Sequence, residues 1–154
     1  MALRKIISGG QTGVDRGGLD AAIGLGIPHG GFCPQGRLAE DGHIPARYEL
    51  LETESSDYAD RTERNVVAGD GTVLVSQGAL TGGSALTQRL AVRHEKPCLH
   101  LDLDVLTIEE AAERLSAWCE EEGISVLNVA GPRESGCPGI CQTVTELVCK
   151  AFCA

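Results

Sequence analysis

Residues 3–15, LRKIISGGQTGVD, place a short apolar run directly before a glycine-rich loop and the first turn of an amphipathic segment. This order is typical of a β-strand that ends in a tight turn and leads into a helix. Glycine lets the backbone adopt positive φ and approach a ligand closely. The N-terminus of the following helix would add free N–H groups and a partial positive charge. The stretch therefore predicts a strand–loop–helix unit whose loop can bind an anion.

Three other loops repeat this design along the chain. They are CPQGR (33–37) after the run 27–32, LTGGS (80–84) after 72–75, and GPRES (131–135) after 126–130. If the four runs are parallel strands of one sheet, all four loops leave the same edge, where open α/β sheets bind ligands. Arginines beside these loops suit bidentate contacts with phosphate-like anions. We therefore expect one anion site, in which the loops at 8–13 and 80–84 hold the ligand from both sides.

The remaining pattern alternates between strands and helices. Thr107 and Glu110 form a predicted capping box, and Ser56 or Asp57 is a candidate N-cap. The expected helices are 14–25, 57–68, 84–94, 108–122 and a terminal helix from Pro138, and the expected further strands are 48–51, 97–101 and 124–130. This alternation predicts an α/β, three-layer α/β/α sandwich with a mostly parallel sheet. The length predicts a single domain over residues 1–154.

Composition narrows the classes of function. A net charge of −9 argues against nucleic-acid binding. No apolar run approaches the ~20 residues of a membrane span, and the first strand leaves no room for a signal peptide, so we expect a cytoplasmic protein with no membrane partner. Seven cysteines would then be reduced. Cys137, Cys141, Cys149 and Cys153 form two C-x3-C pairs, for which burial on the last helix is favoured over a metal–thiolate site.

Catalytic signatures are weak. The first loop is neither G-x-G-x-x-G nor a P-loop, so the nicotinamide and ATPase classes lack their motifs. The four histidines are scattered, and His100 in an apolar strand is interpreted as a core residue. Gly17 and Gly18 within the first helix cost stability, which close packing against a strand or a ligand would explain.

In combination, these motifs resemble the putative molybdenum carrier family. The resemblance rests on SGGQTGVDRG (8–17), CPQGR (33–37) with AEDG (39–42), LTGG (80–83) and AGPR (130–133), together with Arg61-Thr62 and Asn65-Val66. It covers nearly the whole chain. It implies a Rossmann-like fold, related to that of the LONELY GUY phosphoribohydrolases, and a bound molybdenum cofactor (a pterin phosphate) or a nucleotide-like ligand.

The resemblance also implies roles for single residues. Gly9 to Gly13 and Gly82 to Ser84 would cradle phosphate, Arg37 and Arg133 would neutralise it, and Asp15, Arg16, Glu40 and Asp41 would shape the pocket. The phosphoribohydrolases carry P-G-G-x-G-T-x-x-E with a catalytic Glu, whereas this chain reads TGGSALTQR (81–89) without it. That departure argues against the same hydrolysis. Related folds commonly form dimers or tetramers, so a homo-oligomer is expected.

Three hypotheses follow. The first is a carrier that holds molybdenum cofactor, or a related phosphorylated pterin or nucleotide, at the C-terminal edge of the sheet. The second is a nucleotide N-glycosidase with Glu134 or Glu40 as its carboxylate, and the third is a nucleotide sensor. We predict no catalytic residue and no metal ligand for the first hypothesis. Its predicted ligand-binding residues are Gly9, Gly10, Gln11, Thr12, Gly13, Asp15, Arg16, Gly36, Arg37, Thr81, Gly82, Gly83, Ser84, Gly131, Arg133 and Ser135.

Overall fold

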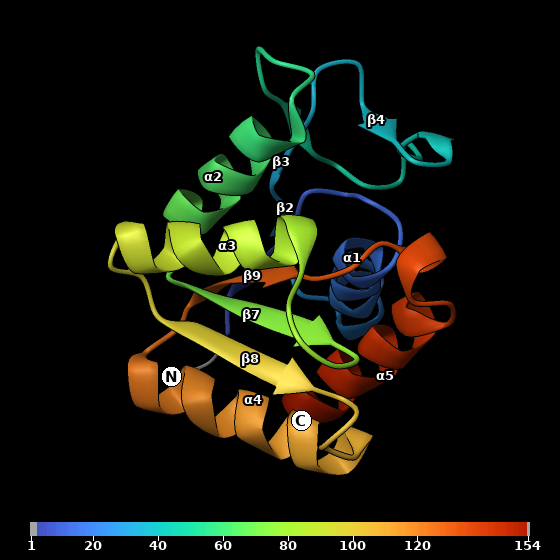
Figure 1. Cartoon of the computed structure of the whole chain (residues 1–154). Helices are drawn as coiled ribbons and strands as arrows, with labels where there is room; N and C mark the ends of the chain where they lie inside the picture. Colours follow the sequence, from blue (N-terminus) through green and yellow to red (C-terminus); the bar gives the residue numbers. More distant parts are fainter. Residues whose placement is uncertain (1–2, 154) are drawn as a thin grey trace.

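A five-stranded parallel sheet forms the centre of the molecule in the computed structural model, which describes residues 3–153 (Figure 1). Met1, Ala2 and Ala154, which the single-domain prediction includes, lie outside the described residues. The strand order is β2-β1-β9-β7-β8, and every neighbouring pair is parallel. The strands are β1 (Lys5–Ile7), β2 (His29–Gly30), β7 (Gly71–Ser76), β8 (Cys98–Asp102) and β9 (Val126–Ala130). β9, the last strand in the sequence, therefore lies between β1 and β7. It brings the loop at 131–135 beside the loops at 8–13 and 80–84.

Helices cover both faces of this sheet. On one face, α1 (Val14–Leu25) and α4 (Ile108–Glu122) each pack against α5 (Ile140–Phe152). On the other face, α2 (Tyr58–Ala68) packs against α3 (Gly82–Arg93) (Figure 1). This arrangement is the predicted Rossmann-like three-layer α/β/α sandwich. None of the described helices is long and apolar enough to span a membrane.

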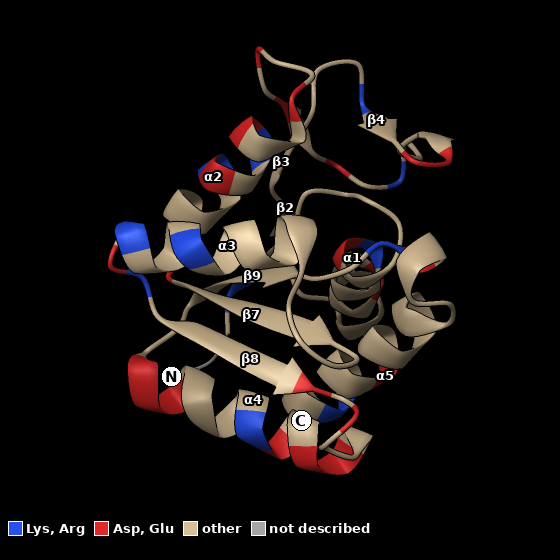
Figure 2. Ribbon diagram, in the orientation of Figure 1, with Lys and Arg blue, Asp and Glu red and all other residues tan. Residues whose placement is uncertain are grey.

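The core divides between the two faces. The larger cluster joins Val73, Leu127 and Val129 of the sheet to Val144 and Leu147 of α5. A smaller cluster of Val66, Leu90 and Ala91 joins α2 to α3. Figure 2 shows that β7 and β9 carry no charged side chain, in keeping with strands that are covered on both faces.

The predicted extended run at 27–32 is wrong as a single strand. It divides into β2, which joins the main sheet, and β3 (Phe32–Cys33), which pairs with β6 (Leu51–Glu52). The break falls at Gly31, where φ is +124° and an added Cβ would lie 2.2 Å from the Ser8 carbonyl oxygen. The loop at 33–37 consequently leaves a separate small sheet rather than the main one. Behind it, β4 (Leu38–Ala39) and β5 (Gly42–His43) form a hairpin.

Several helix ends are confirmed in atomic detail. The Asp57 carboxylate caps α2 by accepting from the Ala59 amide at 3.0 Å, and Thr107 with Glu110 forms the complete capping box of α4. Two ends differ from expectation. α3 begins at Gly82 rather than Ser84, and a 3-10 turn at Glu134–Gly136 delays the last helix to Ile140.

Close packing against α5 and β9, and not a ligand, explains Gly17 and Gly18, two of the three glycines inside α1. A Cβ at Gly17 would lie 2.7 Å from the Cys141 carbonyl oxygen of α5, and one at Gly18 would lie 2.8 Å from the Val129 Cβ of β9. Gly24, in the same helix, has no heavy atom within 4 Å of its added Cβ. The first two glycines thus set how closely α1 approaches its neighbours.

We expect Gly17→Ala to lower the free energy of unfolding by about 1–3 kcal/mol, because α5 must shift to admit the methyl group. Gly24→Ala is the matched control and should raise the same quantity by about 0.5–1 kcal/mol through helix propensity. Urea denaturation followed by circular dichroism measures both changes. Equal effects of the two substitutions would contradict the packing explanation.

Candidate functional site

A cleft of about 550 Å³ lies at the C-terminal edge of the main sheet. Its walls are the segments that follow β1, β7 and β9, and the first turns of α2 and α3. Segments far apart in the sequence therefore meet at the edge where parallel α/β sheets bind ligands.

The structure brings half of the predicted site residues to this cleft. Those that line it are Gly9, Gln11, Asp15, Thr81, Gly83, Ser84, Gly131 and Arg133. Those that do not line it are Gly10, Thr12, Gly13, Arg16, Gly36, Arg37, Gly82 and Ser135.

The first glycine loop is closed by contacts within the protein. The Gln11 amide donates to Asp15 Oδ2 at 3.2 Å, and the Thr12 amide donates to Gln11 Oε1 at 3.1 Å. The Val14 amide donates to the Pro132 carbonyl at 3.2 Å. The amides of Gln11, Thr12 and Val14 are thus occupied, and these contacts fix Asp15 and Gln11 at the cleft wall.

A buried ion pair crosses the cleft between Asp15 at the start of α1 and Arg61 on α2. Arg61 Nη1 lies 3.0 Å from Asp15 Oδ2, and both side chains are buried. An added Cβ at Gly9 would lie 1.7 Å from Arg61 Nη1, so a glycine is required for the guanidinium to reach its partner. Burial raises the pKa of Asp15, and Arg61 opposes that rise.

The second glycine loop, in contrast, presents an open helix terminus. Thr81 is the N-cap of α3, but its side chain accepts no capping hydrogen bond. Within the described residues, the Gly82 and Gly83 amides have no hydrogen-bond acceptor. An uncapped N-terminus with free N–H groups is suited to an anion.

Two arginines and an aromatic ring share one side of the cleft. The Arg133 guanidinium carbon lies 5.4 Å from the centroid of the Tyr58 ring, and that of Arg61 lies 5.3 Å from it. Arg61 is tied to Asp15, whereas Arg133 is exposed at the cleft. Arg133 is therefore the cation available to a ligand here.

Gln11 contributes a polar group that the protein leaves unused. Its Oε1 accepts from the Thr12 amide and from the Glu40 amide at 2.9 Å. Its Nε2 is buried and has no hydrogen-bond partner among the described residues. Because a buried donor without an acceptor is costly, this atom marks a place where a ligand oxygen would stabilise the protein.

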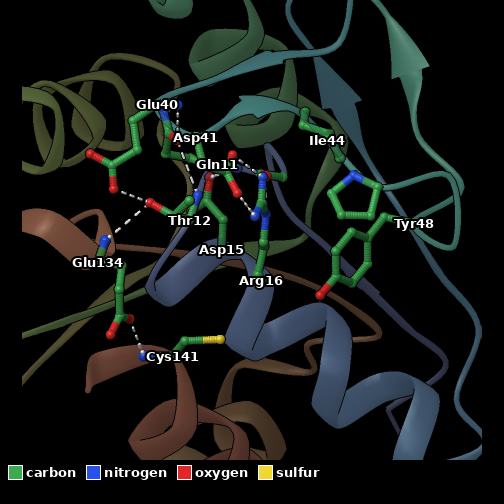
Figure 3. Close-up of polar contacts among 12 residues, drawn as sticks. Gln11, Thr12, Asp15, Arg16, Glu40, Asp41, Ile44, Tyr48, Glu134 and Cys141 are labelled. Carbon is green, nitrogen blue, oxygen red and sulfur yellow. Dashed lines mark hydrogen bonds and ion pairs between the residues drawn. The ribbon is translucent and has the colours of Figure 1, made fainter. Parts of the chain in front are cut away.

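The β4–β5 hairpin supports the site from outside. Glu40 accepts from the Thr12 hydroxyl, and Arg16 donates to Asp41 at 2.6 Å (Figure 3). Glu40 also accepts from the Ser135 hydroxyl at 2.5 Å. These contacts attach the hairpin to the first loop, to α1 and to the segment after β9. Of the residues expected to shape the pocket, Asp15 lines the cleft, whereas Arg16, Glu40 and Asp41 lie outside it, and Glu40 helps to hold Gln11 in place.

Arg37 lies away from the cleft. Its guanidinium donates to the Pro45 carbonyl at 2.9 Å and to the Tyr48 carbonyl at 2.8 Å, within the segment between β5 and β6. Its charge is committed to local backbone because the loop at 33–37 follows β3 and not a strand of the main sheet. Gly36 shares that position, so neither residue belongs to the site proposed below.

The two candidate carboxylates of the hydrolase hypothesis are also placed elsewhere. Glu134 accepts from the Cys141 amide of α5, and Glu40 accepts from the Thr12 hydroxyl (Figure 3). Glu134 also accepts from the Gly139 amide, and Glu40 from the Ser135 hydroxyl. Neither lines the cleft, and Asp15 is the one acidic side chain among the described residues that does.

The cleft also contains residues that were not among the predicted ligand-binding residues, although Arg61, Thr62, Asn65, Leu80, Ala130 and Pro132 belong to the sequence motifs given above. They are Tyr58, Ala59, Thr62, Asn65, Ser76, Gln77, Ala79, Leu80, Leu86, Thr87, Asn128, Val129, Ala130, Pro132, Gly136 and Cys137, as well as Arg61. The sequence did contain a pattern that relates two of them. Tyr58 and Arg61 are three residues apart, so they share one face of the helix that Asp57 caps.

The contacts of the β4–β5 hairpin predict a lowered pKa for the Glu40 carboxyl group, which can be measured. Hydrogen bonds from the Ser135 and Thr12 hydroxyls hold the pKa of Glu40 below its ordinary range. Ser135→Ala should raise that pKa, as followed by NMR titration of the side-chain carboxyl carbon. Because the folded pKa is lowered, the hairpin attachment is complete above about pH 4.3 and is lost as the pH falls through the lowered value. Ser56→Ala, a change at an exposed serine, should leave the Glu40 pKa unaltered, and the same pKa in all three proteins would contradict the attachment.

Comparison with known proteins agrees with this architecture. The model of the Circularly permutated YpsA SLOG family matches residues 6–152. A crystal structure of a putative molybdenum carrier protein from Syntrophus aciditrophicus SB is similar, with 52% sequence identity and a TM-score of 0.96 over 99% of this chain and 96% of that chain. No curated protein matches the chain. Since the family model spans nearly all the described residues, and the crystal structure confirms the resemblance on which the predicted fold rests, the chain belongs to the Circularly permutated YpsA SLOG family.

Proposed function

We propose that this protein is a carrier of molybdenum cofactor, and that it binds the phosphorylated pterin, or a related nucleotide-like anion, in the cleft at the C-terminal edge of the sheet. The similar protein from Syntrophus aciditrophicus SB supports the carrier role. The observation that carries the proposed site is the open N-terminus of α3 in the same cleft as the exposed Arg133.

The phosphate would bind at the start of α3. The unpaired amide of Gly83, which lines the cleft, supplies a donor there, and the helix dipole supplies partial positive charge. Arg133 supplies a full charge and a bidentate fork. This assignment replaces the two-sided grip expected from the sequence, because the Gln11 and Thr12 amides of the first loop already have partners.

The ring system would occupy the rest of the cleft. A volume of about 550 Å³ is in the range that holds small organic ligands. Tyr58 offers an aromatic face, and Leu80 and Leu86 offer apolar contacts. Among the described residues, no group of three or more His, Cys, Asp or Glu is placed to hold a metal ion. The protein would therefore bind the organic part, and the molybdenum would arrive attached to it.

Arg133→Ala should weaken binding of a phosphorylated pterin or a nucleoside monophosphate by roughly 10–100-fold, the value of a charge-assisted hydrogen bond. Isothermal titration calorimetry measures the Kd. Arg89→Ala is the matched control, since Arg89 is an exposed arginine of α3 that does not line the cleft. Equal affinities of the two variants would contradict the assigned site.

Gly83→Asp should change ligand binding and the stability of the protein in opposite directions. The space around Gly83 is open, and an added Cβ meets no heavy atom within 4 Å. A carboxylate in the first turn of α3 should raise the free energy of unfolding by about 0.5–2 kcal/mol. It should also abolish binding of the phosphorylated ligand by repulsion.

The uncharged Gly83→Asn has nearly the same shape and should retain binding. Thermal unfolding and calorimetry on both variants provide the two measurements. A Gly83→Asp protein that binds the phosphorylated ligand as tightly as Gly83→Asn would rule out phosphate at this helix terminus.

A further inference from the structure

The carboxylate in the cleft has one oxygen engaged and one free. Asp15 Oδ2 accepts from the Gln11 amide at 3.2 Å and from Arg61 Nη1 at 3.0 Å. No described residue donates a hydrogen bond to Oδ1. Because Asp15 lines the cleft, Oδ1 is an acceptor that the protein leaves for another molecule.

A donor without a partner belongs to the same loop. Gln11 Nε2 is buried and unpaired, and its amide orientation is fixed because Oε1 accepts from Thr12 and Glu40. Gln11 Nε2 is thus a free donor and Asp15 Oδ1 a free acceptor, on two residues that both line the cleft and are held by the protein's own contacts. A ligand that satisfies both needs an N–H group beside a carbonyl oxygen.

The charges in the cleft give the ligand a direction. The Asp15 carboxylate neutralises Arg61 and leaves no net positive charge on its side of the cleft, while the start of α3 and Arg133 attract phosphate. A phosphorylated ring would therefore place its phosphate toward Gly82 and Gly83, and the polar edge of its ring toward Asp15 and Gln11.

We propose that Asp15 and Gln11 select rings with a 2-amino-4-oxopyrimidine edge, as in pterin and guanine. In this arrangement the ring N–H and the 2-amino group donate to Asp15 Oδ1, and the 4-oxo oxygen accepts from Gln11 Nε2. A 2,4-dioxo ring would turn an oxygen toward the carboxylate, and adenine lacks the oxo acceptor. The inference rests on the proposed function, because it concerns the other end of the same ligand.

The test compares free pterin with lumazine, its 2,4-dioxo counterpart, by fluorescence titration. Both rings lack phosphate, so the comparison reports the ring edge alone. The native protein should bind pterin at least tenfold more tightly, since a lost charge-assisted hydrogen bond with an unpaired buried group costs roughly that much. Asp15→Asn retains an oxygen for Arg61 and should reduce the preference to less than about threefold.

Gln11→Glu provides a second variant that leaves the Asp15–Arg61 pair intact. It preserves the oxygen that accepts from Thr12 and Glu40 and replaces the Nε2 donor with an acceptor. Pterin binding should weaken at least tenfold in this variant. Arg133→Ala should weaken phosphorylated ligands and preserve the ratio of pterin to lumazine affinity.

The outcomes separate the two proposals. Equal affinity of the native protein for pterin and lumazine, together with Arg133-dependent binding of phosphorylated rings, would overturn the ring-edge inference and leave the proposed function standing. Failure of every ring and every phosphorylated ligand to bind would overturn both.

Discussion

The buried ion pair between Asp15 and Arg61 is the contact on which the cleft depends. It joins the first turn of α1 to α2, which belong to opposite helical layers, and it passes directly over the backbone of Gly9. Removing one partner of a buried pair leaves an uncompensated charge and typically costs 3–5 kcal/mol. The pair therefore fixes the distance between the two layers at the sheet edge, and it orients the carboxylate that faces the cleft.

Around this pair, the two glycine loops have different roles despite similar composition. The loop after β1 uses the amides of Gln11 and Thr12 internally, and these bonds hold the side chains of Asp15 and Gln11. The loop after β7 leaves the amides of Gly82 and Gly83 unpaired at the start of α3. The two sides of the cleft consequently differ in their polar groups. One side has the Asp15 carboxylate and the buried Gln11 amide, and the other has the open N-terminus of α3 and Arg133.

The sequence was sufficient to predict the elements whose signals are local. Hydrophobic runs located β7, β8 and β9, and the side chains of Asp57 and Thr107 located the starts of α2 and α4. Since parallel strands share an edge, the meeting of Gly9, Gly83 and Arg133 at one cleft also followed from pattern alone.

What could not be predicted depends on contacts between distant segments. The close approach of Gly31 to Ser8 breaks one extended run into two strands, which removes Arg37 from the main edge. Spacing along the chain places Arg61 on the same face of α2 as Tyr58, but it does not encode the approach of α2 to α1 that brings Arg61 to Asp15.

The central claim is that the cleft holds a phosphorylated ring with its phosphate at the start of α3. Native mass spectrometry of freshly purified protein, combined with molybdenum analysis, tests it most directly. The account predicts an added mass equal to a phosphorylated pterin or nucleotide on the native chain, and its absence from Gly83→Asp purified in the same way. The same bound mass on both proteins, or a bare chain in both even after incubation with molybdenum cofactor, would contradict it.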